Sequence, residues 1–152
     1  MTTESYFNGM NVNCTSQFIF TKYFAFKMAE RAKTKKVRGA IISLSSVMKE
    51  MLTANDLLYC SAKSFNYSFS ETLRLEYGDS LDIMTVLPRS VRSNMNPGVW
   101  MFSVTSEQHV KACLEQLGSE TETYGHWKHD TQQGFREVVP GAGFITSKYN
   151  AA

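Results

Sequence analysis

The first part of the chain has a long segment of interspersed apolar and polar residues, followed by a short apolar segment. Residues 11–33 carry apolar side chains that are not confined to one narrow stripe, so we expect a helix that contacts neighbours on more than one side. The run GAIISLSS at 39–46 is almost continuously apolar up to its serines. Such a run is typical of a strand that is covered on both faces in a parallel sheet.

The middle of the chain repeats this alternation. Residues 47–56 are expected to form a loop, and residues 57–77 a helix that Gly78 can cap. The helix keeps one apolar stripe for three turns, made by Ala62, Phe65, Phe69 and Leu73 and ended by Glu76. The run LDIMTVLP at 81–88 predicts a second buried strand that ends at Pro88.

The last part of the chain is less regular. Residues 89–98 are expected to form a loop or a short helix. A capping box at 105–108 opens a helix that Gly118 ends. Its expected inward residues are Val110, Cys113, Leu114 and Leu117. TYGHWKH at 123–129 predicts a third strand. The chain after Gly134 is less patterned, and VVPGAGF at 138–144 is expected to form turns.

Helices and strands therefore alternate along the chain. This order predicts an α/β fold with a layered parallel sheet and right-handed crossovers. At 152 residues the chain is expected to be a single domain, 1–152, that buries a real core.

Composition and charge add few constraints. Hydrophobic residues make up 43% of the chain and charged residues 20%, which is ordinary for a soluble globular protein. The net charge of +2 gives no reason to expect a nucleic acid partner. Basic residues gather at 22–38, and no aromatic residues interleave the cluster at 33–38, so we interpret it as a solvated helix end rather than a phosphate-binding patch.

The three cysteines predict no special chemistry. Their number is odd, their spacings are wide and no C-x-x-C pattern occurs, which argues against a disulfide framework or a metal site and fits a reducing compartment. Neither a signal peptide nor a membrane-spanning apolar run is expected. Two glycosylation sequons begin at Asn13 and Asn66, but both fall in predicted helices.

One constellation indicates chemistry. Tyr59 and Lys63 are four residues apart and share one face of the predicted helix. An ammonium beside a phenol favours the phenolate, which suits acid–base work near neutral pH. Ser46 stands at the carboxyl end of the first predicted strand, where open α/β sheets bind ligands. A Tyr-x-x-x-Lys pair alone is common on helix surfaces. The interpretation as an active site therefore depends largely on the serine.

These motifs resemble the catalytic half of the short-chain dehydrogenase/reductase family. NVNCTSQFIFTK is similar to the helix with the catalytic asparagine, at Asn13, and the family spacing selects Ser46 over Ser45. YCSAK matches the Tyr-x-x-x-Lys motif, and VLPRSVRSNM resembles the segment that contacts nicotinamide. Through RGAIISLSS, YCSAKSF, LRLEY, TVLP, VKACLEQLG and YGHWKH, the chain is similar to the microsomal 3-oxoacyl-CoA reductase and 17β-hydroxysteroid dehydrogenase branch.

The resemblance implies a role for each motif residue. Tyr59 would be the general acid in reduction and the general base in oxidation. Lys63 would lower the pKa of Tyr59 and bind the nicotinamide ribose. Ser46 would orient the carbonyl oxygen, and Asn13 would hold a proton-relaying water. The alternatives are a helix N-cap for Asn13, a strand-end cap for Ser46 and a solvated lysine for Lys63.

The resemblance also implies a cofactor and partners. NADP is expected, with NAD possible, held by Tyr59 and Lys63 together with Pro88, Val91 and Ser93. The substrate would be a small molecule or an acyl-CoA, and no nucleic acid is expected. A homo-oligomer would pack the helices that carry Asn13 and Tyr59. The branch suggests the endoplasmic reticulum.

The chain departs from the family before Asn13. No Gly-rich turn for the cofactor pyrophosphate precedes that residue, and the strands expected on one side of 39–46 are missing. We therefore expect a partial Rossmann-like, doubly wound sheet that lacks the first βαβ units. Residues 11–133 would be a catalytic half and 134–152 a divergent tail. One strand edge should be exposed, and NADPH binding by this chain alone should be weak.

Two functions remain open from the sequence. The first is an NAD(P)(H)-dependent oxidoreductase that acts on a 3-oxoacyl-CoA or a steroid-like ketone in fatty-acid elongation or lipid metabolism. The second is a truncated, non-catalytic remnant that acts only as an association module.

Overall fold

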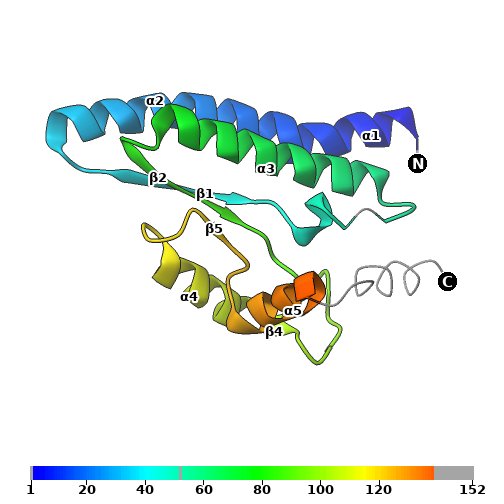
Figure 1. The fold of residues 1–152 in the computed structure, drawn as a ribbon. Coiled ribbons are helices and arrows are strands. Elements are labelled where there is room, and N and C mark those ends of the chain that lie inside the picture. Colours follow the sequence, from blue (N-terminus) through cyan, green and yellow to red (C-terminus); the bar gives the residue numbers. More distant parts are fainter. Residues whose placement is uncertain (1, 52, 139–152) are drawn as a thin grey trace.

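The computed structural model describes residues 2–51 and 53–138 (Figure 1). Its elements, in chain order, are α1 (Thr3–Met10), a π-turn (Asn11–Thr15), α2 (Ser16–Lys35), β1 (Gly39–Leu44), a 3₁₀ turn (Val47–Lys49), α3 (Leu57–Tyr77), β2 (Leu81–Val86), β3 (Val91–Arg92), β4 (Val104–Thr105), α4 (Ser106–Gln116), β5 (Glu122–Thr123) and α5 (Trp127–Val138). The expected alternation of helices and strands is confirmed.

The main sheet is parallel and has the order β1–β2–β5. Residues 39–44 of β1 pair in register with residues 81–86 of β2. Helices α1, α2 and α3 lie on one side of this sheet, and α4 and α5 lie on the other (Figure 1). The short strands β3 and β4 form a separate parallel pair. The α/β fold with helices on both sides of a parallel sheet is confirmed.

Strand β2 lies at the centre of the core. Successive side chains of a strand point to opposite faces, so β2 serves two clusters. On the side of α2 and α3, the buried cluster contains Ala25, Leu73, Leu81 and Ile83. On the side of α4, it contains Met84, Val86 and Cys113. The expectation of a buried strand at this position is confirmed.

Strand β1 differs from the prediction, because it is not covered on both faces. Its side chains Ile42 and Leu44 are 39% and 58% exposed. Among the described residues β1 pairs only with β2, so it is an edge strand with one open face. A short apolar run indicates burial but does not say how many neighbours a strand has. The exposed strand edge, by contrast, was expected.

The N-terminal helix begins earlier than residue 11. Thr2 is its N-cap, and the Thr2 hydroxyl accepts the backbone N–H of Ser5 at 3.2 Å. The helix then continues through the π-turn without a break. Residues 3–10 bury no side chain, so hydrophobic periodicity does not predict this first part of the helix.

Helix α3 has the predicted bounds and ends at Gly78. Ala62 and Leu73 of the predicted stripe are buried, which confirms half of it. The other two residues are less enclosed, because Phe65 is 36% exposed and Phe69 is half-buried, and Asn66 and Ser70 are buried instead.

Helix α4 confirms the capping box. The Thr105 hydroxyl accepts from Gln108 N–H at 3.1 Å, and Gln108 Oε1 accepts from Thr105 N–H at 3.0 Å. Two of the predicted inward residues, Val110 and Leu114, are each 55% exposed. His109 is buried in their place, beside Cys113.

The predicted strand at 123–129 is wrong for most of its length. Strand β5 contains only Glu122 and Thr123, and α5 begins at Trp127. The inward residues of α5 are His129 and Gln133, and such polar residues give no apolar helical period. The turns predicted at 138–144 lie outside the described residues except for Val138, which is the last residue of α5.

The basic segment after α2 has two parts. Lys36 ends α2 in a left-handed conformation (φ 57°), and Lys33 and Lys35 are exposed, as expected for a solvated helix end. Arg38 instead joins β1 to β2. Its guanidinium donates to Asp82 Oδ1 at 2.8 and 3.0 Å and to the carbonyls of Gly78, Asp79 and Leu81.

Candidate active site

Two serines extend β1 at its carboxyl end. The Ser45 N–H donates to the Val86 carbonyl at 2.9 Å, and the Ser45 hydroxyl donates to the Lys63 carbonyl at 2.7 Å. Ser46 is buried, and its hydroxyl oxygen accepts the Met48 N–H at 3.2 Å. Ser46 therefore caps the 3₁₀ turn, and because its oxygen is the acceptor there, its hydroxyl proton remains a donor.

Lys63 is anchored at the same strand end. Its Nζ donates to the Leu44 carbonyl at 3.0 Å, which ties α3 to β1. Burial lowers the pKa of the Lys63 ammonium, and the nearby Cys14 thiol acts in the opposite direction. The alternative of a freely solvated helix lysine does not describe this half-buried, bonded side chain.

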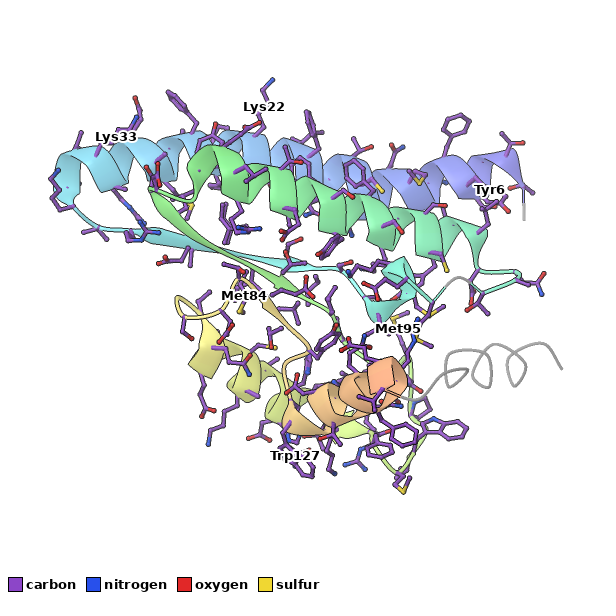
Figure 2. All side chains as sticks on the ribbon, viewed as in Figure 1. Tyr6, Lys22, Lys33, Met84, Met95 and Trp127 are labelled. Atoms are coloured by element: carbon purple, nitrogen blue, oxygen red, sulfur yellow. The ribbon has the colours of Figure 1, made fainter. Side chains whose placement is uncertain are left out.

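Tyr59 lies one helical turn before Lys63. Its ring centroid is 5.6 Å from Lys63 Nζ, so the phenol and the ammonium share one face of α3. The ring is 44% exposed, which leaves the hydroxyl reachable from solvent. Figure 2 shows this end of α3, close to the 3₁₀ turn that follows Ser46.

Asn13 lies inside the π-turn. Its Nδ2 donates to the Gly9 carbonyl at 2.9 Å, and it is not an N-cap, because the helix begins at Thr3. A π-turn contains one residue more than an α-turn and is frequent at functional sites. Asn13, Leu44 and Lys63 line one groove of about 260 Å³ between the π-turn and β1.

The three predicted cofactor contacts after β2 lie in different surroundings. The Pro88 carbonyl accepts the Val47 N–H at 3.5 Å, which brings Pro88 next to Ser46. Val91 pairs with Val104 in the β3–β4 pair, and Ser93 forms an exposed turn. Within residues 2–51 and 53–138, no hydrogen bond joins Val91 or Ser93 to the residues around Lys63.

Sequence reasoning missed part of the polar network around these groups. Asn66, Gln17 and Ser43 line the same groove as Asn13 and Lys63. The signal available was Asn66 itself, a polar residue one turn after Lys63 on α3, which the aromatic stripe obscured.

Other candidate chemistry is scarce in the described part of the chain. No group of three or more His, Cys, Asp or Glu side chains there is arranged to hold a metal ion. The cysteines Cys14, Cys60 and Cys113 are buried free thiols. None of the helices in these residues is long and apolar enough to cross a membrane.

Comparison with models of protein families shows which family the chain belongs to. A family model for the short chain dehydrogenase matches residues 1–103. The chain belongs to the short-chain dehydrogenase family. That family is one of oxidoreductases, and the assignment of Ser46, Tyr59 and Lys63 to its catalytic motifs stays a prediction.

Curated relatives of this chain include 3-oxoacyl-CoA reductases and hydroxysteroid dehydrogenase-like proteins. The zebrafish (Danio rerio) very-long-chain 3-oxoacyl-CoA reductase-A is 31% identical over 123 residues, which are 79% of this chain and 37% of that protein. The zebrafish inactive hydroxysteroid dehydrogenase-like protein 1 is 29% identical over 121 residues, 75% of this chain and 37% of that protein. The chain thus spans well under half of the length of the relatives it matches.

Solved structures show the same fold. A short chain dehydrogenase from Burkholderia cenocepacia, solved in complex with NADP, superposes with a TM-score of 0.68 at 20% identity. The match covers 88% of this chain and 56% of that one. The chain therefore has a partial Rossmann-like fold.

Proposed function

We propose that this chain supplies the proton-transfer part of an NAD(P)(H)-dependent carbonyl reductase. A 3-oxoacyl-CoA or a steroid-like ketone is the proposed substrate, in fatty-acid elongation or lipid metabolism, and the similarity to 3-oxoacyl-CoA reductases and hydroxysteroid dehydrogenases supports this choice. The observation that carries the proposal is the anchoring of Lys63 Nζ on the Leu44 carbonyl. This bond holds the ammonium on the face of α3 that carries Tyr59, 5.6 Å from the centroid of its ring.

Each residue has a step in the proposed reduction. The Ser46 hydroxyl donates to the substrate carbonyl oxygen and orients it. Tyr59 then gives its proton to that oxygen, and the carbonyl carbon takes up the hydride that the cofactor would supply. The ketone thus becomes an alcohol. Lys63 stabilises the phenolate that remains, because an adjacent positive charge favours the ionised phenol. Asn13 holds the water that returns a proton from solvent through Lys63.

The site fits one end of a nicotinamide cofactor. Lys63 and Tyr59 would hold the ribose at the carboxyl end of β1, where α/β sheets bind ligands, with Pro88, Val91 and Ser93 as proposed nicotinamide contacts. The cofactor would supply the hydride, and NADP is the proposed form. Before Asn13 the sequence has no Gly-rich turn for the pyrophosphate, so we propose weak binding by this chain alone.

The test is turnover with a matched pair of variants. We expect Tyr59→Phe to lower the NADPH-dependent reduction of a 3-oxoacyl-CoA or a steroid ketone by about 10²–10⁴-fold, because the proton donor is lost. Tyr77→Phe removes the same atom from the far end of α3 and should keep full activity. Unchanged turnover in a folded Tyr59→Phe protein would exclude Tyr59 as the proton donor.

A second candidate is association without catalysis. The open edge of β1 and its exposed Ile42 and Leu44 favour it, because unpaired strand edges bind other chains. One relative is also named as an inactive hydroxysteroid dehydrogenase-like protein. A soluble wild-type chain with no turnover on either substrate class, at saturating NADPH, supports this candidate over the first.

We also propose a homo-oligomer that packs α2 and α3 against a second copy. An aromatic groove runs between these helices, with Phe18 and Phe65 each within 5.8 Å, centroid to centroid, of the Phe69 ring. Phe65→Glu should reduce the mass measured by sedimentation, whereas Leu75→Glu, at another exposed position of α3, should not. Equal masses for both variants would contradict this interface. Location at the endoplasmic reticulum stays a prediction.

A further inference from the structure

The inward face of α3 carries a buried amide beside the proposed site. Asn66 is only 4% exposed and follows Lys63 by three residues, so the two side chains lie on neighbouring parts of the same helix face. Buried polar groups nearly always have hydrogen-bond partners, and an amide offers two donors and one acceptor oxygen. The partners of Asn66 therefore show what this residue holds.

Asn66 connects α3 to the π-turn and to α2. In the amide orientation that satisfies its surroundings, Asn66 Nδ2 lies 2.9 Å from the Asn13 carbonyl and 2.7 Å from Gln17 Oε1. The same nitrogen lies 3.2 Å from the Ala62 carbonyl within α3. One side chain thus fixes the backbone of the turn that carries Asn13.

Gln17 extends the network to β1. Its Nε2 donates to Ser43 Oγ at 2.7 Å. Ser43 immediately precedes Leu44, whose carbonyl accepts from Lys63 Nζ. The contacts therefore close a ring that runs from Lys63 through β1 and Gln17 to Asn66 and back along α3.

We propose that Asn66 and Gln17 are positioning residues, whose ring of hydrogen bonds holds the Asn13 turn and the Lys63 ammonium in fixed relative places. The inference rests on the proposed function for the roles of Asn13 and Lys63. The ring itself exists without substrate or cofactor. An apolar side chain of similar size would fill the same space, but only the amides fix the orientation of both neighbours.

The test measures the titration of Lys63 by NMR of its side-chain carbon Cε in the full chain. In Asn66→Leu the ring opens, Lys63 Nζ leaves the Leu44 carbonyl and becomes hydrated, and its pKa should move up toward the ordinary lysine value. Gln17→Leu should give a shift in the same direction. The double variant should shift no more than Asn66→Leu alone, because residues in one network do not act additively.

Ser70→Ala is the matched control. Ser70 is also buried on the inward face of α3, one turn after Asn66, and among the described residues its hydroxyl has no hydrogen-bond partner. Its removal should leave the Lys63 titration unchanged. An active enzyme should in addition lose about 10–10²-fold in kcat in Asn66→Leu, because small misplacements of reacting groups are costly.

A Lys63 titration that is the same in wild type and in a folded Asn66→Leu protein would overturn the proposal. If Asn66→Leu does not fold, the Lys63 titration of Gln17→Leu is compared with that of the wild type instead. Gln17→Leu leaves the bond from Asn66 to the Asn13 turn in place, and an unchanged titration in this variant would likewise overturn the proposal. A shifted titration in a chain without turnover supports the ring and contradicts only the proposed function.

Discussion

Strands β1 and β2 are neighbours of equal length with similar apolar sequences, yet they have opposite surroundings. They pair in parallel, with Ile42 of β1 opposite Met84 of β2. Ile42 is 39% exposed, and Met84 is fully buried between β2 and α4. One strand is enclosed on both faces and the other is open on one face and along one edge.

The two strands therefore have different roles, because β2 stabilises the fold and β1 contacts the proposed site. β2 supplies both core clusters and holds the layers together. β1 and the serine that follows it supply polar contacts instead: Ser43 accepts from Gln17, and Leu44 and Ser45 bond to Lys63. The proposed site therefore lies on the less buried strand, whose edge remains available to another chain.

The largest effect should come from truncating the enclosed strand. We expect Met84→Ala to lower the free energy of unfolding by about 2–5 kcal/mol, because it removes core volume that the neighbours cannot refill. Ile42→Ala, at the paired position, should cost about 1 kcal/mol or less, since much of that side chain already contacts water. Denaturant unfolding measures both, and equal losses would show that β1 is as enclosed as β2.

The second effect concerns the helix that covers β2. Burial holds the pKa of His109 at about 4, below the ordinary 6.5, so the folded chain keeps this imidazole neutral. The neutral imidazole contributes up to about 3 kcal/mol to the free energy of unfolding. This contribution is complete above about pH 6.5 and is lost as the pH falls toward 4. The difference in unfolding free energy between wild type and His109→Gln should shrink over this window, and a constant difference would contradict it.

The third effect is at the start of both strands. The Arg38–Asp82 pair is partly exposed, and Arg38 also bonds three backbone carbonyls. Asp82→Asn should therefore cost only about 0.2–1 kcal/mol and less at high salt. Arg38→Met should cost more than Asp82→Asn in the same thermal unfolding assay. The reverse order would show that the ion pair, rather than the carbonyl contacts, joins the strands.

The smallest effect on stability should come from charging the open face. Ile42→Lys should change the unfolding free energy by about 0.5 kcal/mol or less, because the site is a partly exposed edge. It should nevertheless reduce concentration-dependent light scattering, since edge lysines oppose strand pairing. Val110→Lys, on the exposed side of α4, is the control and should leave the scattering unchanged. Equal scattering from Ile42→Lys and wild type would mean that the open edge does not drive association.

The sequence predicts most of the fold, and it proposes the residues of the candidate site. Helix α3, the two long strands and the capping box at Thr105 follow from local spacing, because each signal lies within a few residues. The positions of Ser46, Tyr59 and Lys63 follow from a motif of fixed spacing. The exposed edge of β1 was expected, but its open face could not be predicted, because it depends on neighbours distant in the chain.

Other features were missed for a different physical reason. Helix α5 turns polar residues such as His129 and Gln133 inward, so hydrophobic periodicity does not reveal it. On α3 the pattern correctly placed Ala62 and Leu73 inward, but it also placed Phe65 and Phe69 there and missed Asn66. In both cases buried hydrogen bonds, which a hydrophobic pattern cannot register, decide which side of the helix faces the core.

The account is tested most directly by calorimetric titration of this chain with NADPH. Lys63, one of the residues proposed for proton transfer, bonds to the end of β1, while the described chain offers no Gly-rich turn for the pyrophosphate. We predict weak binding, with no saturation at submicromolar NADPH. Submicromolar binding by this chain alone would contradict the account.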